Sequence, residues 1–292
     1  MTRATVPGDL SFLERINFLV TNRIPRRLLT RLFGWFSKLE QPVVRTISLA
    51  LWKRFSDLDL SDADKSDFRS VHDCFTRRLK PNARPVAADL DIATSPCDAI
   101  VGACGRLVGI TAIQAKGFPY SLRDLLHESG LIECYRDGVF VTLRLTSSMY
   151  HRFHAPYDCR VQRVTYISGD TWNVNPPALR CIQGLFCKNE RAIIPCELSG
   201  SGITLTLVPI AAIMVAGIRL HFADVLLRIR FKGASTIPCA ADLAKGEEMG
   251  WFEHGSTIIV FAPPGVQLHE SIESGLEIKA GRPLLRLNSS ST

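Results

Sequence analysis

The sequence feature that most constrains the fold is a series of short apolar segments that begins near residue 90 and continues almost to the C-terminus. Gly, Pro, Asn or Asp bounds most of these segments, which is typical of strands joined by tight turns. Many short strands with one helical segment, predicted at 122–127, favour a β-rich sandwich or barrel. The predicted strands cover residues 99–103, 106–113, 139–145, 161–167, 192–196, 203–209, 211–218, 256–261 and 276–279.

The first 60 residues have a different, helical pattern. Apolar side chains recur at helical spacing over residues 28–39, and Pro25 stands where the first turn of a helix tolerates proline. A second apolar stripe follows Pro42, and a short helix is predicted at 67–79. The predicted fold class is therefore α+β, with an N-terminal amphipathic helical region at 1–65 and a β-rich domain at 66–292.

Charge and hydropathy suggest what the helical region contacts. The net charge is +7, yet the mean hydropathy is +0.11, and the first 60 residues hold ten Lys and Arg against five acids. Helices that are basic on one face and apolar on the other, here with Trp35, Phe36 and Trp52, suit the headgroup boundary of an anionic membrane. Packing of these helices on the core is an equally good explanation, and both can hold.

Composition excludes several classes of protein. With 46% hydrophobic and 22% charged residues the chain is not disordered, and its longest apolar run, 210–218, is too short to span a bilayer. No secretory signal is evident. The nine cysteines contain no C-x-x-C pair and fit no zinc template, so we predict reduced thiols and no metal site. On composition alone the basic charge leaves nucleic acid open as a partner.

Three places concentrate reactive side chains. Asp98 follows a Ser-Pro turn signal, where an ordinary turn carboxylate is the simplest explanation. His151 and His154 flank Arg152, and general acid–base work suits this pair better than metal binding, because no further ligands stand nearby. Ser256 follows Gly255 directly before an apolar strand, and a base and an acid from elsewhere in the chain could activate its hydroxyl.

Seven segments, in this order along the chain, resemble the phosphatidylserine decarboxylase family. The resemblance covers about residues 70–285, and the basic helical N-terminus resembles the membrane-docking part of bacterial members. The segments are FTRRLKPNARPV (75–86), SPCDAIVGACG (95–105), IQAKGFPYSLRDLL (113–126), YHRFHAPYDC (150–159), NVNP (173–176), LFCKNERA (185–192) and KGEEMGWFEHGSTIIVF (245–261).

The resemblance implies a proenzyme that cleaves itself. Asp98 is then expected to orient His154, and His154 to activate the hydroxyl of Ser256. That hydroxyl attacks the carbonyl of Gly255, and elimination leaves a β chain of residues 1–255 and an α chain of residues 256–292. The dehydroalanine left at position 256 is hydrolysed and loses its nitrogen as ammonia, so the α chain begins with a pyruvoyl group derived from Ser256, which is the implied cofactor.

The same resemblance implies the second reaction and its partners. Phosphatidylserine forms a Schiff base with the pyruvoyl group and loses CO2 to give phosphatidylethanolamine, and the pyruvoyl group accepts the electrons released. His151 is our candidate for moving protons, and Arg152 for contacting the lipid phosphate. We expect a homodimer, peripheral on the cytoplasmic face of a bacterial-type membrane, with no nucleic-acid partner. The family segment 188–191 is expected to be an ion-paired structural turn rather than a substrate contact.

Three departures from the family pattern and three other functions stay open. His254 stands where Leu is usual, Met149 where Asp is usual, and Ala99 where Gly is usual. None removes an expected catalytic residue. One alternative is a pyruvoyl decarboxylase of a related serine lipid or a free amino acid. A second is an inactive lipid-binding relative. A third is a carrier module, since Ser-Pro-x-Asp and the segment around Lys116 resemble a lipoyl-type half-barrel.

Overall fold

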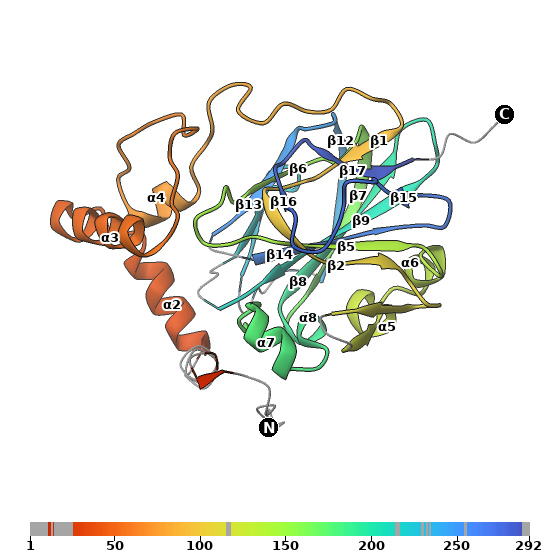
Figure 1. Cartoon of the computed structure of the whole chain (residues 1–292), viewed down its shortest axis with the longest axis horizontal. Coiled ribbons are helices and arrows are strands. Elements are labelled where there is room, and N and C mark those ends of the chain that lie inside the picture. The colour runs from red at the N-terminus through yellow and green to blue at the C-terminus, as the bar shows by residue number, and fades with distance from the viewer. Residues whose placement is uncertain are drawn as a thin grey trace.

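An eight-stranded antiparallel sheet dominates the computed structural model, which describes residues 11, 12, 14, 26–114, 118–213, 217–228, 231, 233, 235–253 and 256–287 (Figure 1). Its strand order is β12-β7-β8-β9-β14-β5-β2-β16. The central strands β9 and β14 are almost wholly apolar, because other layers cover both of their faces. In chain order the strands are β2 (Ala99–Arg106), β5 (Val139–Arg144), β7 (Cys159–Ile167), β8 (Arg191–Leu198), β9 (Thr204–Ala211), β12 (Thr236–Leu243), β14 (Ser256–Ala262) and β16 (Glu277–Ile278).

Two smaller sheets pack on one face of the large sheet. The first has the order β11-β10-β13-β6 and the second β1-β17-β15. Apolar side chains from all three sheets form one continuous core, which includes Phe153, Phe252 and Ile258. This core is a sandwich. The strands are β1 (Ile92–Thr94), β6 (Arg152–His154), β10 (Ile218–Leu220), β11 (Val225–Leu227), β13 (Glu248–Phe252), β15 (Gln267–Leu268) and β17 (Pro283–Arg286).

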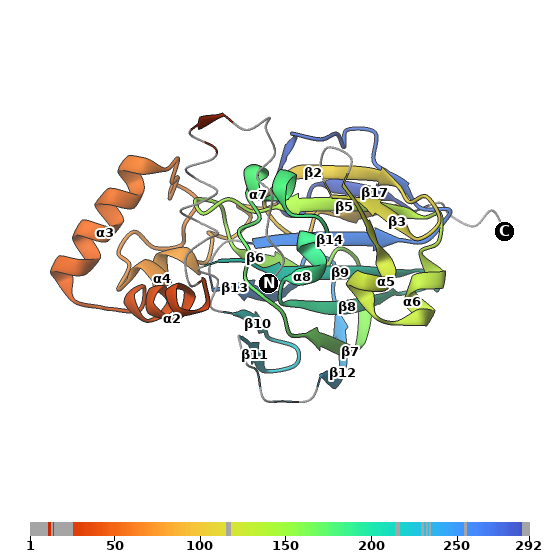
Figure 2. The same cartoon turned by 90° about the horizontal axis from the view of Figure 1, so that it is seen from below.

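Short helices and a small hairpin cover the opposite face of the large sheet (Figures 1 and 2). Leu122, Leu125, Leu185 and Phe186 from these helices are fully buried and share a second core with Ile259 of β14. The large sheet thus lies between two apolar layers. The covering elements are α5 (Leu122–Leu126), α6 (Ser129–Cys134), α7 (Pro176–Cys181), α8 (Leu185–Lys188), β3 (Thr111–Ile113) and β4 (Pro119–Ser121).

The N-terminal helices project to one side of the sandwich (Figure 1). They are α2 (Arg26–Phe36), α3 (Pro42–Phe55) and α4 (Val71–Phe75). α3 contains no buried residue, although Trp52 stacks on Phe75 with ring centroids 5.8 Å apart. Lys38 reaches back to Glu253 at 2.9 Å and so links the end of α2 to the segment that leads to Ser256. Among the described residues, no helix has both the length and the apolar content needed to cross a membrane.

The structure confirms the α+β class and corrects several details. Over the described residues the sheets are open and none closes into a barrel. The helix expected at 67–79 is only α4, because the Ser70 hydroxyl caps its start and Asp73 ties back to Lys65. The strand expected at 106–113 breaks at a turn where Gly109 has φ +59°, and the one expected at 211–218 is divided between β9 and β10. The division near residue 65 stays a prediction.

Candidate active site

Ser256 is the first residue of β14, and the sheet fixes its backbone. It pairs with Ala211 of β9, while Thr257 pairs with Ile210 on that side and with Arg144 of β5 on the other. Both ladders continue along the strand, so the chain from residue 256 onward stays held by hydrogen bonds whatever happens to the preceding peptide bond. His254 and Gly255 lie outside the described residues, as does the side chain of Ser256.

The imidazole of His154 lies at the end of β6 in one defined tautomer. Its Nδ1 is 2.9 Å from the carbonyl oxygen of Gly246 and its Nε2 is 3.1 Å from the hydroxyl of Tyr150. A carbonyl oxygen can only accept, so Nδ1 carries the proton and Nε2 accepts from Tyr150. Burial lowers the pKa of His154, although the Gly246 bond and nearby carboxylates partly oppose this. The ring is therefore a neutral base at pH 7.

Asp98 lies close to His154 but is held by other groups. Its carboxylate accepts from Arg84 at 2.6 to 3.1 Å and from the backbone N–H of Ala280 at 2.9 Å. Arg84 also donates to Asp62 at 2.9 Å. Burial by itself would lower the pKa of Arg84, and the bonds to the two carboxylates outweigh it and raise that pKa. The direct Asp98–His154 hydrogen bond that a triad predicts is not made; the carboxylate acts on the imidazole through its field.

His151 is fully buried beside the same strand. Its Nδ1 donates to the carbonyl of Met149 at 2.8 Å, and its ring lies against Phe75 with centroids 3.8 Å apart. Phe75 in turn lines a cavity beside the N-terminal helices. His151 is thus separated from that cavity by one aromatic ring.

The guanidinium of Arg152 is hydrogen-bonded to other groups of the protein. Its donors face the carbonyls of Thr76 and Arg77 and the carboxylate of Glu248, the last at 2.5 Å, and it lies over the ring of Trp251. These contacts fix β6 against the start of the β-rich core. Because the Arg152 guanidinium is used in these contacts, the geometry favours another cation for contact with substrate.

The segment 188–191 is built around a buried arginine. Arg191 donates to the carbonyls of Asp124, Leu125, Cys187 and Asn189 at 2.8 to 2.9 Å. These bonds satisfy carbonyls at the ends of short helices that would otherwise be buried without partners. The structural turn that we expected is present, but the guanidinium of Arg191 bonds backbone carbonyls rather than the carboxylates of an ion pair.

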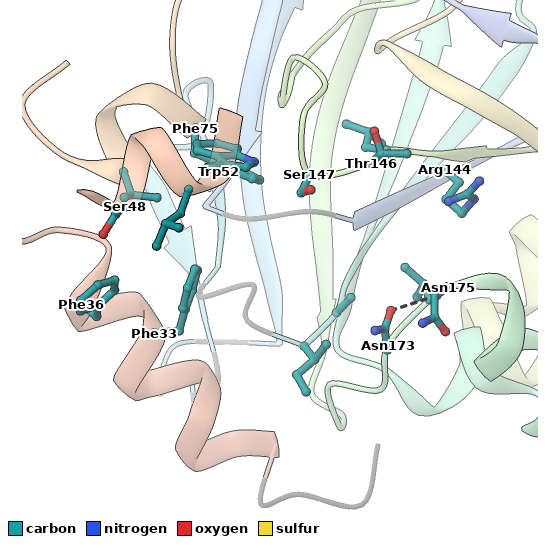
Figure 3. A pocket seen from close by; sticks show the side chains of 16 residues that line it. Phe33, Phe36, Ser48, Trp52, Phe75, Arg144, Thr146, Ser147, Asn173 and Asn175 are labelled. Atoms are coloured by element: carbon teal, nitrogen blue, oxygen red, sulfur yellow. Dashed lines mark hydrogen bonds between the residues drawn. The ribbon is translucent and has the colours of Figure 1, made fainter. Parts of the chain in front are cut away.

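A cavity of about 670 Å³ lies between the N-terminal helices and the ends of β5 and β9 (Figure 3). Its size is in the range of small-molecule sites. One side is apolar and comes from α2, α3 and α4, with Phe33, Trp52 and Phe75. The other side, which we call the polar side, comes from β5 and two loops and also includes Leu145, Val174, Ala212 and Ile213. Its polar lining residues are Arg144, Thr146, Ser147, Asn173 and Asn175.

Comparison with known proteins places this geometry in a family. The family model described as phosphatidylserine decarboxylase matches residues 71–286. The chain belongs to the phosphatidylserine decarboxylase family. It is 37% identical to the phosphatidylserine decarboxylase proenzyme of Halorhodospira halophila, over 94% of each chain. The corresponding proenzymes of Haemophilus influenzae and Anaeromyxobacter sp. (strain K) are 32% and 30% identical, over 94% and 93% of this chain and 97% and 98% of theirs.

Two of the three departures from the family pattern, Ala99 and Met149, lie in the described residues, and neighbouring groups accommodate both. Ala99 is fully buried at the start of β2, where its methyl group belongs to the sandwich core. The sulfur of Met149 lies 3.5 Å from the backbone N–H of Thr146 and so closes the turn that precedes the family's Tyr-His segment. His254, like Lys116 of the carrier hypothesis, lies outside the described residues.

Sequence reasoning missed two side chains of this decarboxylase-family site. Tyr150 stands within the family segment at 150–159, but only the fold turns its hydroxyl onto His154. Arg144 lies in the strand predicted at 139–145, and nothing in its neighbourhood along the chain marks it as part of a cavity. Among the described residues, no group of three or more His, Cys, Asp or Glu side chains has the arrangement of a metal site.

Proposed function

We propose that this chain is a phosphatidylserine decarboxylase, made as a proenzyme that cleaves itself between Gly255 and Ser256. The observation that carries the proposal is the cavity, whose polar side includes Arg144, the register partner of Thr257, and whose apolar side continues onto the exposed faces of α2 and α3. Phe36 and Leu51 belong to both the cavity wall and the exposed apolar surface. Such a cavity suits a molecule with a charged headgroup and a long apolar part.

In self-cleavage, His154 is the proposed base. Its Nε2 is unprotonated and takes the proton from the hydroxyl of Ser256, which attacks the carbonyl of Gly255. Tyr150 must then move off Nε2 or pass the proton on, so we give it a positioning role. Asp98 stabilises the imidazolium through its field rather than by a direct bond. The expected products are chains of residues 1–255 and 256–292.

The pyruvoyl group formed from Ser256 supplies a carbonyl that binds the substrate amine and accepts the electrons released with CO2. The surroundings fit such a group, because β14 is paired on both sides and keeps the new terminus beside the cavity after cleavage. His151 is the proposed proton donor to the product carbon. It lies behind Phe75, so that ring must shift to give it access.

The exposed apolar face of α2 and α3 is the proposed membrane contact. Basic residues on the same helices, among them Lys53 and Arg54 in the last turn of α3, suit anionic headgroups. Peripheral attachment on the cytoplasmic face and homodimer formation remain predictions of the resemblance. The exposed apolar side chains of this face are Leu28, Leu32, Trp35, Phe36, Val43, Ile47, Leu51 and Phe55.

Intact mass of the purified protein tests the proposal. We expect two chains in place of one of 32.4 kDa, and a single uncleaved chain for Ser256→Ala. Ser271→Ala, an exposed serine in the same C-terminal segment, is the matched control and should cleave like the wild type. Cleaved protein should release CO2 from phosphatidylserine in vesicles. A wild-type protein that remains one chain with an unmodified Ser256 would sink the proposal.

A further inference from the structure

Arg144 differs from the other arginines close to the site in having no hydrogen-bond or ion-pair partner within the described part of the chain. It is half-buried, and this burial lowers its pKa. By contrast, the guanidinium groups of Arg77, Arg84, Arg152 and Arg191 donate to carbonyls or carboxylates of the protein. A half-buried guanidinium with no acceptor among the described residues is available to an anionic ligand.

The position of Arg144 tells us where such a ligand would bind. It is the last residue of β5, it pairs with Thr257, and it lines the polar side of the cavity (Figure 3). Register partners in a sheet are only about 5 Å apart at Cα, so Arg144 is one residue along the ladder from the reactive centre. Thr257, on the same face of the sheet, has a buried hydroxyl with no partner among the described residues. Both features suit a polar, anionic group.

We propose that the guanidinium of Arg144 binds the phosphodiester of the lipid headgroup, an inference that rests on the proposed decarboxylase function. Guanidinium matches a phosphodiester with two parallel hydrogen bonds. The apolar wall across the cavity, formed by Phe33 and Trp52, then takes the glycerol and the first part of the acyl chains.

The chemistry of the reaction favours the phosphodiester over the carboxylate as the anion bound. The carboxylate loses its charge as CO2 leaves, so an ion pair to it would stabilise the ground state more than the transition state and slow the reaction. The phosphodiester keeps its charge throughout. An ion pair to it binds substrate and transition state equally, which lowers KM and leaves kcat unchanged.

Kinetics with a short-chain phosphatidylserine test the inference without a requirement for membrane docking. Arg144→Gln should cleave itself like the wild type, and its KM should rise by about 10- to 100-fold with kcat nearly unchanged, as expected for loss of a charge-assisted hydrogen bond. Arg144→Lys keeps the charge without the paired geometry and should raise KM less, by about 3- to 10-fold. Arg106→Gln, an exposed arginine at the far end of the β2–β5 pair, should match the wild type.

Inhibition by short-chain phosphatidylethanolamine separates the two anions, because this product carries the phosphodiester and no carboxylate. Its inhibition constant should rise in Arg144→Gln by the same factor as KM. An unchanged inhibition constant with a raised KM would assign Arg144 to the carboxylate and overturn the proposal, as would an unchanged KM. If Arg144→Gln is not recovered folded, Arg144→Lys decides by the same two constants. A wild-type protein that neither cleaves nor decarboxylates refutes the proposed function instead.

Discussion

At the scale of single residues, the site depends on which group is hydrogen-bonded to each ring nitrogen of His154. The carbonyl of Gly246 fixes the proton on Nδ1, and the hydroxyl of Tyr150 reserves Nε2 as an acceptor. Because burial favours the uncharged ring, the base is ready without any further proton loss at neutral pH. The hydroxyl of Tyr150 completes the polar contacts of the ring, since it can donate to the unprotonated Nε2.

The rate of self-cleavage should therefore follow the neutral fraction of His154. Protonation at low pH removes the base, so the rate should rise with pH, reach half its maximum below the ordinary histidine pKa of about 6.5 and be flat at neutral pH. Pulse-labelled proenzyme, chased at a series of pH values and resolved by gel, gives this profile. A midpoint above pH 7 would contradict a buried neutral base.

Tyr150→Phe removes the hydroxyl bonded to Nε2, so the ring loses one of its two positioning contacts and self-cleavage should slow at every pH. A neutral hydrogen bond is worth about 1 kcal/mol, which corresponds to a rate lower by about fivefold. Tyr157→Phe is the matched control, since its exposed hydroxyl bonds only the carbonyl of Leu90. If the pH profiles of self-cleavage are equal for the two variants, Tyr150 has no role in the mechanism.

At the scale of elements, α2 and α3 differ from the helices that cover the large sheet, because they leave large apolar side chains exposed. Leu122 and Leu126 of α5 are fully buried, whereas Trp35 of α2 and Phe55 of α3 are mostly exposed. α2 and α3 each expose a row of large apolar side chains, and a large exposed apolar patch marks an interaction site. The cavity opens beside the same two helices, so one pair of elements serves both the proposed membrane contact and the path of the lipid.

Replacing Trp35 and Val43 by Ser should weaken binding to anionic vesicles while self-cleavage continues. Neither side chain lines the cavity, and each buried apolar side chain contributes roughly 1.5–3 kcal/mol to partition, about tenfold or more. Sedimentation with vesicles measures the loss, and intact mass checks cleavage. Val108→Ser, equally apolar and exposed on the sandwich, is the control. Loss of the same size in this control would mean that α2 and α3 are not the docking face.

At the scale of the whole molecule, one buried ionic network joins distant parts of the chain. Arg84 lies between Asp62, from the segment that follows α3, and Asp98, at the head of β2. Asp98 also accepts from the N–H of Ala280, 182 residues further along the chain. The network connects the N-terminal segment to the sandwich and positions the carboxylate whose field acts on His154.

Arg84→Gln should destabilise the fold, because it leaves Asp98 buried without its counter-ion. Breaking a buried pair in this way costs about 3–5 kcal/mol, which urea denaturation of the cleaved protein would reveal as a lower midpoint. The control is Arg286→Gln, which breaks the half-exposed pair with Asp91 and should cost less than about 1 kcal/mol. Similar midpoints for the two variants would show that the network contributes no more than a surface pair.

The sequence alone was sufficient for features that depend on near neighbours. The period of apolar residues predicted most of the central strands, and Pro42 with the stripe that follows it predicted α3 closely. Ser256 was expected to be at the head of a strand, and it is. Asn175 and Pro176 were an available signal for α7, since a capping side chain and a first-turn proline mark a helix start, yet a six-residue helix shows too little periodicity to be predicted.

Only the tertiary structure decided the partners of the reactive groups. His154 meets Gly246 from 92 residues away, Asp98 meets Arg84 and Ala280 rather than the imidazole, and Arg144 faces a cavity whose other wall is a helix about a hundred residues earlier in the chain. Local sequence fixes which face of a strand a side chain occupies. Hydrogen bonds and ion pairs act over short distances, so the partner of a side chain depends on how sheets and helices pack. That packing is a property of the whole chain.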